Sequence, residues 1–526
     1  MSLKRLAGET AVYGISSILG RLLNFVLITP FVTRPEVFTP EQYGVVGDLF
    51  FYTAFLIAFL VFRLDTAVFR FASRAEYSAR AVCRNAQQMV AIAVVIVIGA
   101  GLLLAPQIAD WMSYPDRVTY IQLFLLIVAF DALSAIPLAR LRLEQRPWFF
   151  AAVNLANIIV NIVLIYALLK FIPDWIEGGR DFGWYDERFK ISYYFFAILA
   201  AAAFKFLLLV GDRWWRDSNL FKPQISRSRL IGSSKPEKNS QVKGQKEKVL
   251  DEPLTQDLNN ASPTWKEMLI YAAPLVVVAV CGIVNTLVGP TMLKNYYGSD
   301  VTGNLYWSGQ YAAAMKLAVF LTLFTTAYNF AAEPFFFRQS GKDPKRADLM
   351  IYANASRAFA LVTSLAIAGI MLLLPILQFY LGRNLREGLE VLPILLAANF
   401  MLGLYYSFAM AYKLTDKTYL GGLIALVGAA IVVAGNILFI DDYGIYAPAW
   451  AGFACFFVMS FLAYLVSRKH FPVPYPIGRF FLYALATAGV VYLGVGWESI
   501  WARVGLLTVY VVGMIGLEWK WLRGLV

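Results

Sequence analysis

Ionisable side chains interrupt several long apolar segments of this 526-residue chain. The stretch FRLDTAVFRFASRAE, Phe62 to Glu76, carries Arg63, Asp65 and Arg70 directly after an almost entirely apolar run that begins at Val45. A charged side chain at the centre of a bilayer costs roughly 2.5 to 3.5 kcal/mol on insertion scales, so it normally faces a partner or a wet cavity. Some of the charged side chains lie within about two turns of a segment end, where we expect them to reach the interface: Arg70, Lys170, Lys205, Glu333 and Arg357. The others are deeper: Arg21, Asp48, Arg63, Asp65, Asp131 and Lys316.

The spacing of these residues allows two interpretations. Arg21 shares a helical stripe with small and polar residues, among them Asn24, which is typical of a helix that lines a cavity. Arg63 and Arg70 are seven residues apart and share a face, whereas Asp65 points about 160° away from Arg63. Either Arg21 and Asp65 form an ion pair that holds two helices in register, or the cations face the path of an anionic substrate.

Polar uncharged residues could complete such a path. Asn154 and Asn157, with Asn161, recur on one face of a helix. Hydrogen bonds between helices explain them most simply, and contact with a substrate is the alternative. Tyr52 lies in the same apolar segment as Asp48 and could also donate a hydrogen bond to a substrate.

The composition determines the protein class that must position these residues. Of all residues 59% are apolar, 16% aromatic and only 15% charged, and the mean hydropathy is +0.61. A soluble globular protein has about a quarter charged residues. The sequence therefore predicts an all-α polytopic membrane protein with about 14 transmembrane helices. The candidate segments are residues 8–32, 43–71, 85–109, 117–139, 147–172, 191–211, 266–292, 303–332, 352–381, 388–412, 418–440, 446–467, 477–496 and 499–518.

The connections between these segments alternate in charge. Lys and Arg dominate every second connection and both ends of the chain, whereas Asp and Glu dominate the others. This bias predicts that both termini are cytoplasmic. The formal net charge of +12 is then mostly a signal of membrane orientation, and we expect no nucleic-acid partner.

A weak internal repeat divides the chain into two similarly oriented halves. At one fixed offset Gly44 aligns with Gly303, Tyr52 with Tyr311 and Thr66 with Thr325, among other matches. We predict an N-terminal six-helix bundle at residues 1–211, a disordered cytoplasmic linker at 212–265, a second six-helix bundle at 266–467 and two additional helices at 468–526. Parallel repeats of this kind place a central cavity at their interface.

The chain lacks the usual signals of an enzyme or a metal protein. It contains no phosphate-binding loop of the G-x-x-x-x-G-K-[ST] type, and its only histidine, His470, lies in a predicted turn. Cys83, Cys281 and Cys455 are widely separated, and we expect them to be packing residues. We therefore predict no enzymatic activity, no metal site and no cofactor.

The stretch GETAVYGISSILGRLLNFVLITPFVTRPEVFTPEQYGVV, followed by RLDTAVFRFAS, resembles the opening of the Wzx-type polysaccharide biosynthesis flippases. These belong to the multidrug/oligosaccharidyl-lipid/polysaccharide (MOP) exporter superfamily. Asp65 and Arg70 match residues of the family pattern, whereas Arg63 stands where a small residue is common. The resemblance implies a flippase of the bacterial inner membrane that translocates an undecaprenyl-pyrophosphate-linked oligosaccharide for surface polysaccharide or O-antigen synthesis.

This hypothesis assigns a substrate-binding set. A lipid-linked pyrophosphate needs cations and hydrogen-bonding groups inside a wet cavity, and the candidates are Arg21, Asn24, Tyr52, Arg63, Asp65, Asn154, Asn157 and Lys316. The expected partners are the lipid-linked oligosaccharide and membrane lipids, with a glycan polymerase or glycosyltransferases as further candidates. The alternative is an ion-coupled drug or metabolite exporter of the same superfamily, in which Asp48, Asp65 or Asp131 would titrate during transport. A membrane-embedded glycosyltransferase or polymerase is disfavoured because none of the predicted outer connections is long enough for an outer catalytic domain.

Overall fold

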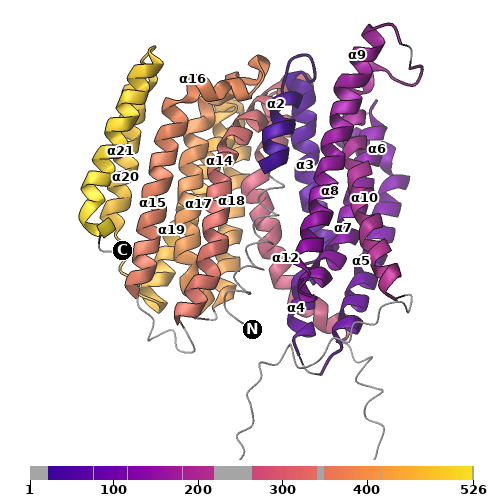
Figure 1. Ribbon diagram of the computed structural model, residues 1–526, viewed down its shortest axis with the longest axis horizontal. Coiled ribbons are helices and arrows are strands. Elements are labelled where there is room, and N and C mark those ends of the chain that lie inside the picture. The colour runs from indigo at the N-terminus through magenta and orange to yellow at the C-terminus, as the bar shows by residue number, and fades with distance from the viewer. Residues whose placement is uncertain are drawn as a thin grey trace, which may run out of the picture.

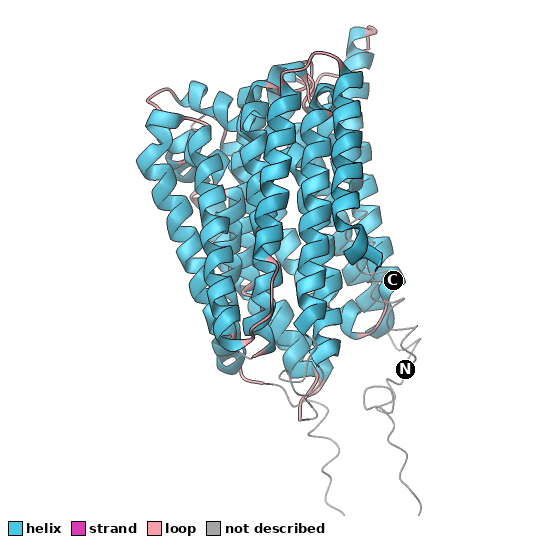
Figure 2. Cartoon of the chain, turned by 90° about the vertical axis from the view of Figure 1, so that its left-hand side faces the viewer, coloured by secondary structure: helices cyan, strands magenta, loops and turns pink. Residues whose placement is uncertain are grey.

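The computed structural model describes residues 22–74, 76–114, 116–180, 182–217, 263–340, 349–415 and 417–523. Within these residues the regular secondary structure is entirely helical (Figure 2). Thirteen helical stretches of the described residues are long and apolar enough to cross a membrane, which confirms the predicted class. The first predicted segment, residues 8–32, lies mostly outside the described residues, but its end is helical at Asn24–Ile28 and in α2 (Thr29–Val32).

Two bundles make up most of the molecule. The helices of the first bundle are α3 (Pro40–Val61), α4 (Leu64–Ala72), α5 (Ala79–Leu103), α6 (Ala105–Trp111), α7 (Val118–Leu143), α8 (Pro147–Tyr166), α9 (Ile172–Glu177) and α10 (Lys190–Asp217). The helices of the second bundle are α12 (Trp265–Leu287), α13 (Gly289–Tyr296), α14 (Val301–Ser340), α15 (Leu349–Leu372), α16 (Leu374–Leu377), α17 (Leu392–Leu414), α18 (Thr418–Tyr443) and α19 (Tyr446–His470). The last helices are α20 (Ile477–Val495) and α21 (Ile500–Arg523).

Figure 1 shows the two bundles side by side, with α20 and α21 on the outer flank of the second bundle. The bundles contact each other mainly through α3 and α14. Most of the predicted linker, residues 218–262, lies outside the described residues, whereas α10 continues past residue 211 to Asp217.

Capping boxes start one transmembrane helix in each bundle. The Thr39 hydroxyl accepts a hydrogen bond from the backbone N–H of Gln42, whose side chain accepts from the Thr39 N–H, and α3 begins there. Thr264 and Glu267 do the same at the start of α12. This exchange satisfies backbone N–H groups that would otherwise lack a partner in the first turn, so each apolar run begins at a defined residue.

Helix α12 lies across both bundles. Near its start, the Tyr271 ring packs edge-on against Phe71 of α4 at 5.9 Å between centroids, and the Arg70 guanidinium lies 4.2 Å above that ring. Asn85 of α5 donates a hydrogen bond to the carbonyl oxygen of Pro263 at 3.3 Å. The same helix also packs along α18 of the second bundle. The helix that opens the second half of the chain is thus anchored to both halves.

A sharp break divides the predicted segment 43–71. Phe62 and Arg63 both have positive φ, at 50° and 53°, and separate α3 from α4. Few non-glycine residues adopt this conformation, and consecutive pairs are sparser still, so surrounding packing must hold it in place. Arg63 therefore sits in a bend rather than on a continuous helix face.

The last two helices attach to α15 through a buried carboxylate. Glu518 of α21 is fully buried and forms ion pairs with Arg357 of α15 and, at 3.1 Å, with Arg479 of α20. The Trp521 indole N–H also donates a hydrogen bond to Asn354 at 3.0 Å. A carboxylate shared between two arginines compensates the charge that burial would otherwise leave unpaired.

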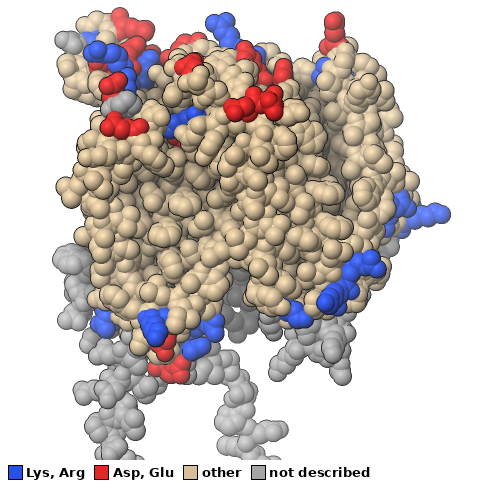
Figure 3. Space-filling model, turned by 180° about the vertical axis from the view of Figure 1, so that it is seen from behind, with Lys and Arg blue, Asp and Glu red and all other residues tan. Residues whose placement is uncertain are grey.

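Charge separates the two ends of the molecule. Figure 3 shows Asp and Glu gathered at one end, Lys and Arg prevailing at the other, and a broad belt with few charges between them. The belt is the surface expected to contact lipid, and the unequal ends match the charge alternation of the connections. On the charge rule the end rich in Lys and Arg is predicted to be cytoplasmic.

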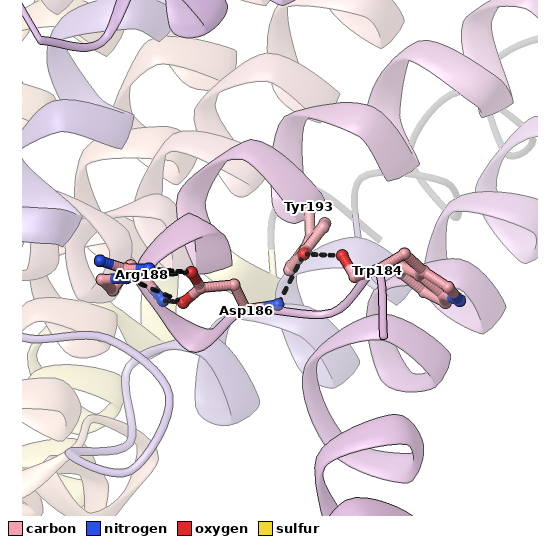
Figure 4. A network of polar contacts seen from close by, with 4 residues as sticks. All are labelled: Trp184, Asp186, Arg188 and Tyr193. Atoms are coloured by element: carbon pink, nitrogen blue, oxygen red, sulfur yellow. Dashed lines mark hydrogen bonds and ion pairs between the residues drawn. The ribbon is translucent and has the colours of Figure 1, made fainter. Parts of the chain in front are cut away.

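Aromatic side chains order the connection between α9 and α10 at the acidic end. The Tyr193 hydroxyl donates a hydrogen bond to the Trp184 carbonyl oxygen and accepts one from the Asp186 N–H (Figure 4). Arg188 binds the Asp186 carboxylate at 2.7 Å and holds its pKa below the ordinary value. The tyrosine and the ion pair thus fix the shape of this loop.

Candidate functional site

The acidic end between the bundles is closed by a direct backbone contact of α3 and α14. A Cβ atom added at Gly44 would overlap the carbonyl oxygen of Leu305, and one added at Gly309 would overlap that of Pro40. Only glycine permits this approach, because any side chain would push the helices apart. The two glycines therefore allow the bundles to close here.

The connection between α16 and α17 covers this contact. Gln310 of α14 donates a hydrogen bond to the Asn384 carbonyl oxygen at 2.8 Å and accepts one from the Gly388 N–H at 3.0 Å. The Asn384 side chain in turn donates to the Phe38 carbonyl oxygen just before α3, at 3.0 Å. These bonds connect the second bundle to the segment that leads into the first bundle.

A buried ion pair joins the bundles beside the glycine contact. Asp48 of α3 accepts a hydrogen bond from the Lys294 ammonium of α13 at 2.7 Å and another from the Tyr114 hydroxyl at 2.9 Å. The Asp48 and Lys294 side chains are 0% and 1% exposed, and the Lys294 Nζ lies 3.9 Å from the centre of the Tyr114 ring. Removing one partner of such a pair leaves an uncompensated charge away from water, which is strongly unfavourable. Asp48, Lys294 and Tyr114, together with Gly44 and Gly309, are called the barrier below.

Sequence reasoning found Asp48 but missed Lys294. The seventh predicted segment ends at residue 292, which places Lys294 in a connection. In the structure α13 continues the helical path beyond Gly289 and carries Lys294 into the protein interior. Asp48 is an acid without a nearby base in its own repeat. This is the signal in the sequence that its partner lies in the other repeat.

A cavity of about 400 Å³ lies between the bundles. The second bundle contributes most of its wall, and the first bundle with the segment before it contributes Asn24, Tyr43, Val46, Gly47, Phe50 and Phe51. The polar side chains that the second bundle contributes include Asn285, Lys316, Thr322, Asn399 and Asn436. The cavity is thus apolar over most of its wall, with polar groups at a few points, which is typical of ligand sites.

Lys316 is the only charged residue among the described residues that line this cavity. Its ammonium lies 5.7 Å from the centre of the Phe50 ring of the facing bundle. No carboxylate of the described residues forms an ion pair with it. A cation in that situation is available to an anionic ligand, because its charge is not already neutralised.

Amides form the second polar element of the cavity. Asn399 accepts a hydrogen bond from the Thr322 hydroxyl at 2.8 Å and donates to the Leu395 carbonyl oxygen of its own helix. Asn285 and Asn436 also donate to backbone carbonyl oxygens, and their Oδ1 atoms have no hydrogen-bond donor among the described residues. These acceptors could receive hydroxyl groups once a ligand or water reaches them.

The predicted site residues fall into separate places. Asn24 and Lys316 line the cavity together, whereas Arg21 lies outside the described residues. Tyr52 packs against Phe51 and Trp111. The role of these residues in binding stays a prediction.

The other predicted site residues lie away from this lining. Arg63 is in the bend after α3, and the Oδ1 atom of Asp65 in α4 has no hydrogen-bond partner among the described residues. Asn154 donates to the Phe150 carbonyl oxygen one turn earlier in α8, at 2.9 Å, and Asn157 lies on the same helix. The structure therefore does not gather the predicted set into one site.

Two charged residues expected to reach the interface instead form ion pairs inside the protein. Lys205 of α10 binds Asp131 of α7 at 2.6 Å, and Arg357 binds the buried Glu518. Burial of these side chains against neighbouring helices favours a protein partner over the distant headgroups. The pairs hold helices together, and within the described part of the chain they leave Lys316 as the cation that faces the cavity.

Solved structures share this fold, although no protein-family model and no curated protein matches the sequence. A structure described as lipid II flippase MurJ in an inward closed conformation has a TM-score of 0.66 at 11% identity, covering 97% of this chain and 99% of that chain. An inward-facing multidrug resistance MATE family transporter of the MOP superfamily has a TM-score of 0.59 at 13% identity, covering 90% and 96%. MATE in the straight conformation has a TM-score of 0.57 at 13% identity, covering 91% and 96%. The chain therefore has the fold of these membrane proteins.

Proposed function

We propose that the protein is a flippase that moves a lipid-linked oligosaccharide, carried on undecaprenyl pyrophosphate, across the bacterial inner membrane. The observation that carries this proposal is Lys316, a lysine without an ion-pair partner among the described residues, in a cavity between two bundles. A pyrophosphate needs a fixed cation where water is scarce, and sugar hydroxyls need amide acceptors. Asn285, Asn399 and Asn436 lie in the same wall.

The barrier supports a transport cycle by alternating access. The bundles meet at the acidic end, whereas Figure 3 shows the surface hollowed between them at the end rich in Lys and Arg. Rocking of the bundles would open the barrier and close the opposite end around the cargo. The head group would then cross inside the protein while the lipid chain stays in the bilayer.

The structural likeness supports the same assignment at the level of the fold. One similar structure is itself described as a lipid II flippase, and this chain covers nearly all of it. O-antigen or another surface polysaccharide is the proposed destination of the glycan. Association with a glycan polymerase or glycosyltransferases follows from that destination and stays a prediction.

The test is transport of a lipid-linked oligosaccharide by the full chain in proteoliposomes, measured by cleavage of the exposed glycan with a membrane-impermeant glycosidase. Lys316→Gln is expected to lower the rate roughly tenfold or more, since charge-assisted hydrogen bonds contribute about 1.5 to 3 kcal/mol. Lys316→Arg should retain part of the activity. Lys170→Gln is the matched control, because Lys170 is a half-exposed lysine in another helix. Normal transport by a folded Lys316→Gln variant would refute the proposal.

An ion-coupled exporter is the second candidate, favoured by the likeness to a multidrug transporter and by Asp65. That carboxylate has an Oδ1 without a hydrogen-bond partner, and no ion pair involves it among the described residues, whereas Asp48 and Asp131 are both bound by lysines. Proton-driven export of an organic cation by the wild type, abolished in Asp65→Asn and retained in Lys316→Gln, would establish the exporter instead.

A further inference from the structure

A second pocket lies in the first bundle, away from the central cavity. It measures about 320 Å³ and is formed by the first two turns of α5 and the last turns of α7 and α10. Its lining shares no residue with that of the central cavity. It lies at the ends of three candidate membrane spans, on the side of the molecule where Lys and Arg prevail (Figure 3).

Arginines dominate the charge of this pocket. Arg80 and Arg84 come from α5, Arg140 from α7 and Arg213 from α10, and the acids in the lining are Glu144 and Asp212. The lining contains four arginines and two acids, so its formal net charge is +2.

The two acids are already engaged by arginines. Glu144 binds Arg140 at 2.6 Å, and Asp212 binds Arg146, which lies just outside the lining, through two hydrogen bonds of 2.7 and 2.9 Å. Arg146 also lies 3.6 Å from Glu144. The carboxylates are therefore shared among several guanidinium groups. Arg84 is an exposed residue of the lining that forms no ion pair with a described residue, so its charge is available to an anionic ligand.

A proline in α7 shapes the inner part of the pocket. Pro137 has no N–H, so the Leu133 carbonyl oxygen one turn earlier loses its partner within the helix. Gln87 of α5 donates a hydrogen bond to that oxygen at 3.3 Å, while its own Oε1 has no donor among the described residues. Beside them the lining is apolar, with Ile136 and Leu209.

The pocket thus combines a basic rim, an apolar interior and a position at the membrane surface. We propose that it binds a phosphate group, supplied by the head group of an anionic phospholipid of the leaflet at this end. Basic pockets between transmembrane helices on the cytoplasmic side are suited to such head groups. The guanidinium groups would bind the phosphate oxygens, the apolar lining would contact the start of the acyl chains, and a head-group hydroxyl could donate to Gln87.

The test measures lipid binding and is independent of transport. The purified full chain is titrated with phosphatidylglycerol or phosphatidylcholine in detergent, and bound lipid is counted by native mass spectrometry. Tighter binding of phosphatidylglycerol is expected. Removing two rim charges in Arg80→Gln/Arg84→Gln should weaken it about fivefold per arginine, without a change for phosphatidylcholine. Arg84→Lys should bind almost as the wild type does.

Arg468→Gln/Lys469→Gln is the matched control, because it removes two exposed positive charges from the end of α19 in the other bundle. A separate arm adds millimolar inorganic phosphate. Failure of phosphate to displace the lipid supports the lipid source, and displacement combined with tight binding of phosphate alone overturns it in favour of a soluble phosphate.

Equal binding of the two lipids by the wild type, or equal losses in the pocket and control variants, would overturn the proposal. If the double variant does not fold, Arg84→Gln alone decides, since this exposed side chain lies at the rim. A fivefold loss then supports the site, and wild-type binding contradicts it.

Discussion

At the scale of single residues, several of the described charges at membrane depth hold the protein together, whereas Lys316 lines the cavity without an ion pair. Asp48 with Lys294, Asp131 with Lys205, and Glu518 with Arg357 are paired in the interior. Lys316 instead faces the cavity. The sequence revealed which charged residues lie at membrane depth, because depth follows from position in an apolar run. It could not reveal their partners, since Asp48 and Lys294 are separated by 246 residues.

The Asp48–Lys294 pair predicts a specific double-mutant result. Lys294→Met should lower the stability of the closed barrier by about 3 to 5 kcal/mol, because it leaves a buried carboxylate without its cation. Adding Asp48→Asn should restore a large part of that loss. Chemical unfolding of the purified variants in detergent measures both effects.

The control for this cycle is Lys170→Met, which removes a half-exposed lysine whose carboxylate partner is also exposed. Additive losses in the double variant would show that the two residues do not act as a pair.

At the scale of helices, hydropathy predicts where a chain crosses the membrane but not where its helix breaks. The predicted segment 43–71 is two helices in the structure, because Phe62 and Arg63 adopt left-handed conformations. Neither residue type signals such a bend, and only the packing around it can stabilise it. Residues 352–381 likewise comprise α15, a short α16 and a 3₁₀ turn. The glycines at the barrier are visible in the sequence, but the sequence does not show that each of them lies against the backbone of a neighbouring segment.

Glu518 is expected to control the docking of α20 and α21. Glu518→Gln removes the charge between two arginines and should lower the thermal unfolding midpoint by several degrees, since uncompensated buried charges are strongly unfavourable. Glu498→Gln changes an exposed acid between the same helices and should have little effect. Equal midpoints for the two variants would contradict the assigned role.

The Gly309 position is expected to control closure of the bundles. Gly309→Ala places a Cβ against the Pro40 carbonyl oxygen, so the closed state should become less populated. Ser308→Cys, a buried position next to it, reports this change through labelling by a membrane-impermeant maleimide added from outside. Gly282→Ala is the control, because its added Cβ would meet no atom within 4 Å. Labelling should rise in the first variant only.

At the scale of the whole molecule, the fold expected from the sequence is the one observed. Two helical bundles surround a central cavity, as the repeat and the alternating charges predicted, and the described residues contain thirteen candidate spans. The candidate site was less predictable. Asn24 and Lys316 meet in the cavity, whereas Asn154 and Asn157 lie on α8. A stripe of polar residues distinguishes one face of a helix. Whether that face meets another bundle, lipid or a cavity depends on how the helices pack.

A disulfide between α3 and α14 beside the barrier should stop transport by alternating access. A Cβ at Gly47 would lie 3.1 Å from the Ala312 Cβ, slightly closer than the usual disulfide range of about 3.5 to 4.5 Å, so a small shift suffices. Gly47→Cys/Ala312→Cys, in a background without Cys83, Cys281 and Cys455, should lose transport on oxidation and regain it with a reductant. Each single cysteine variant serves as the control. Undiminished transport by fully cross-linked protein would exclude this cycle.

The close backbone contact at Gly44 and Gly309 has a consequence for the way the two bundles separate at the acidic end. Dispersion forces between closely packed atoms lose roughly a quarter to a half of their strength over a gap of about 0.5 to 1 Å, and glycine has no side chain to span such a gap as the helices part. A small tilt of one bundle would therefore weaken the whole contact between these two positions. We expect this contact to open over a short movement, which limits the half-open intermediates through which ions could leak.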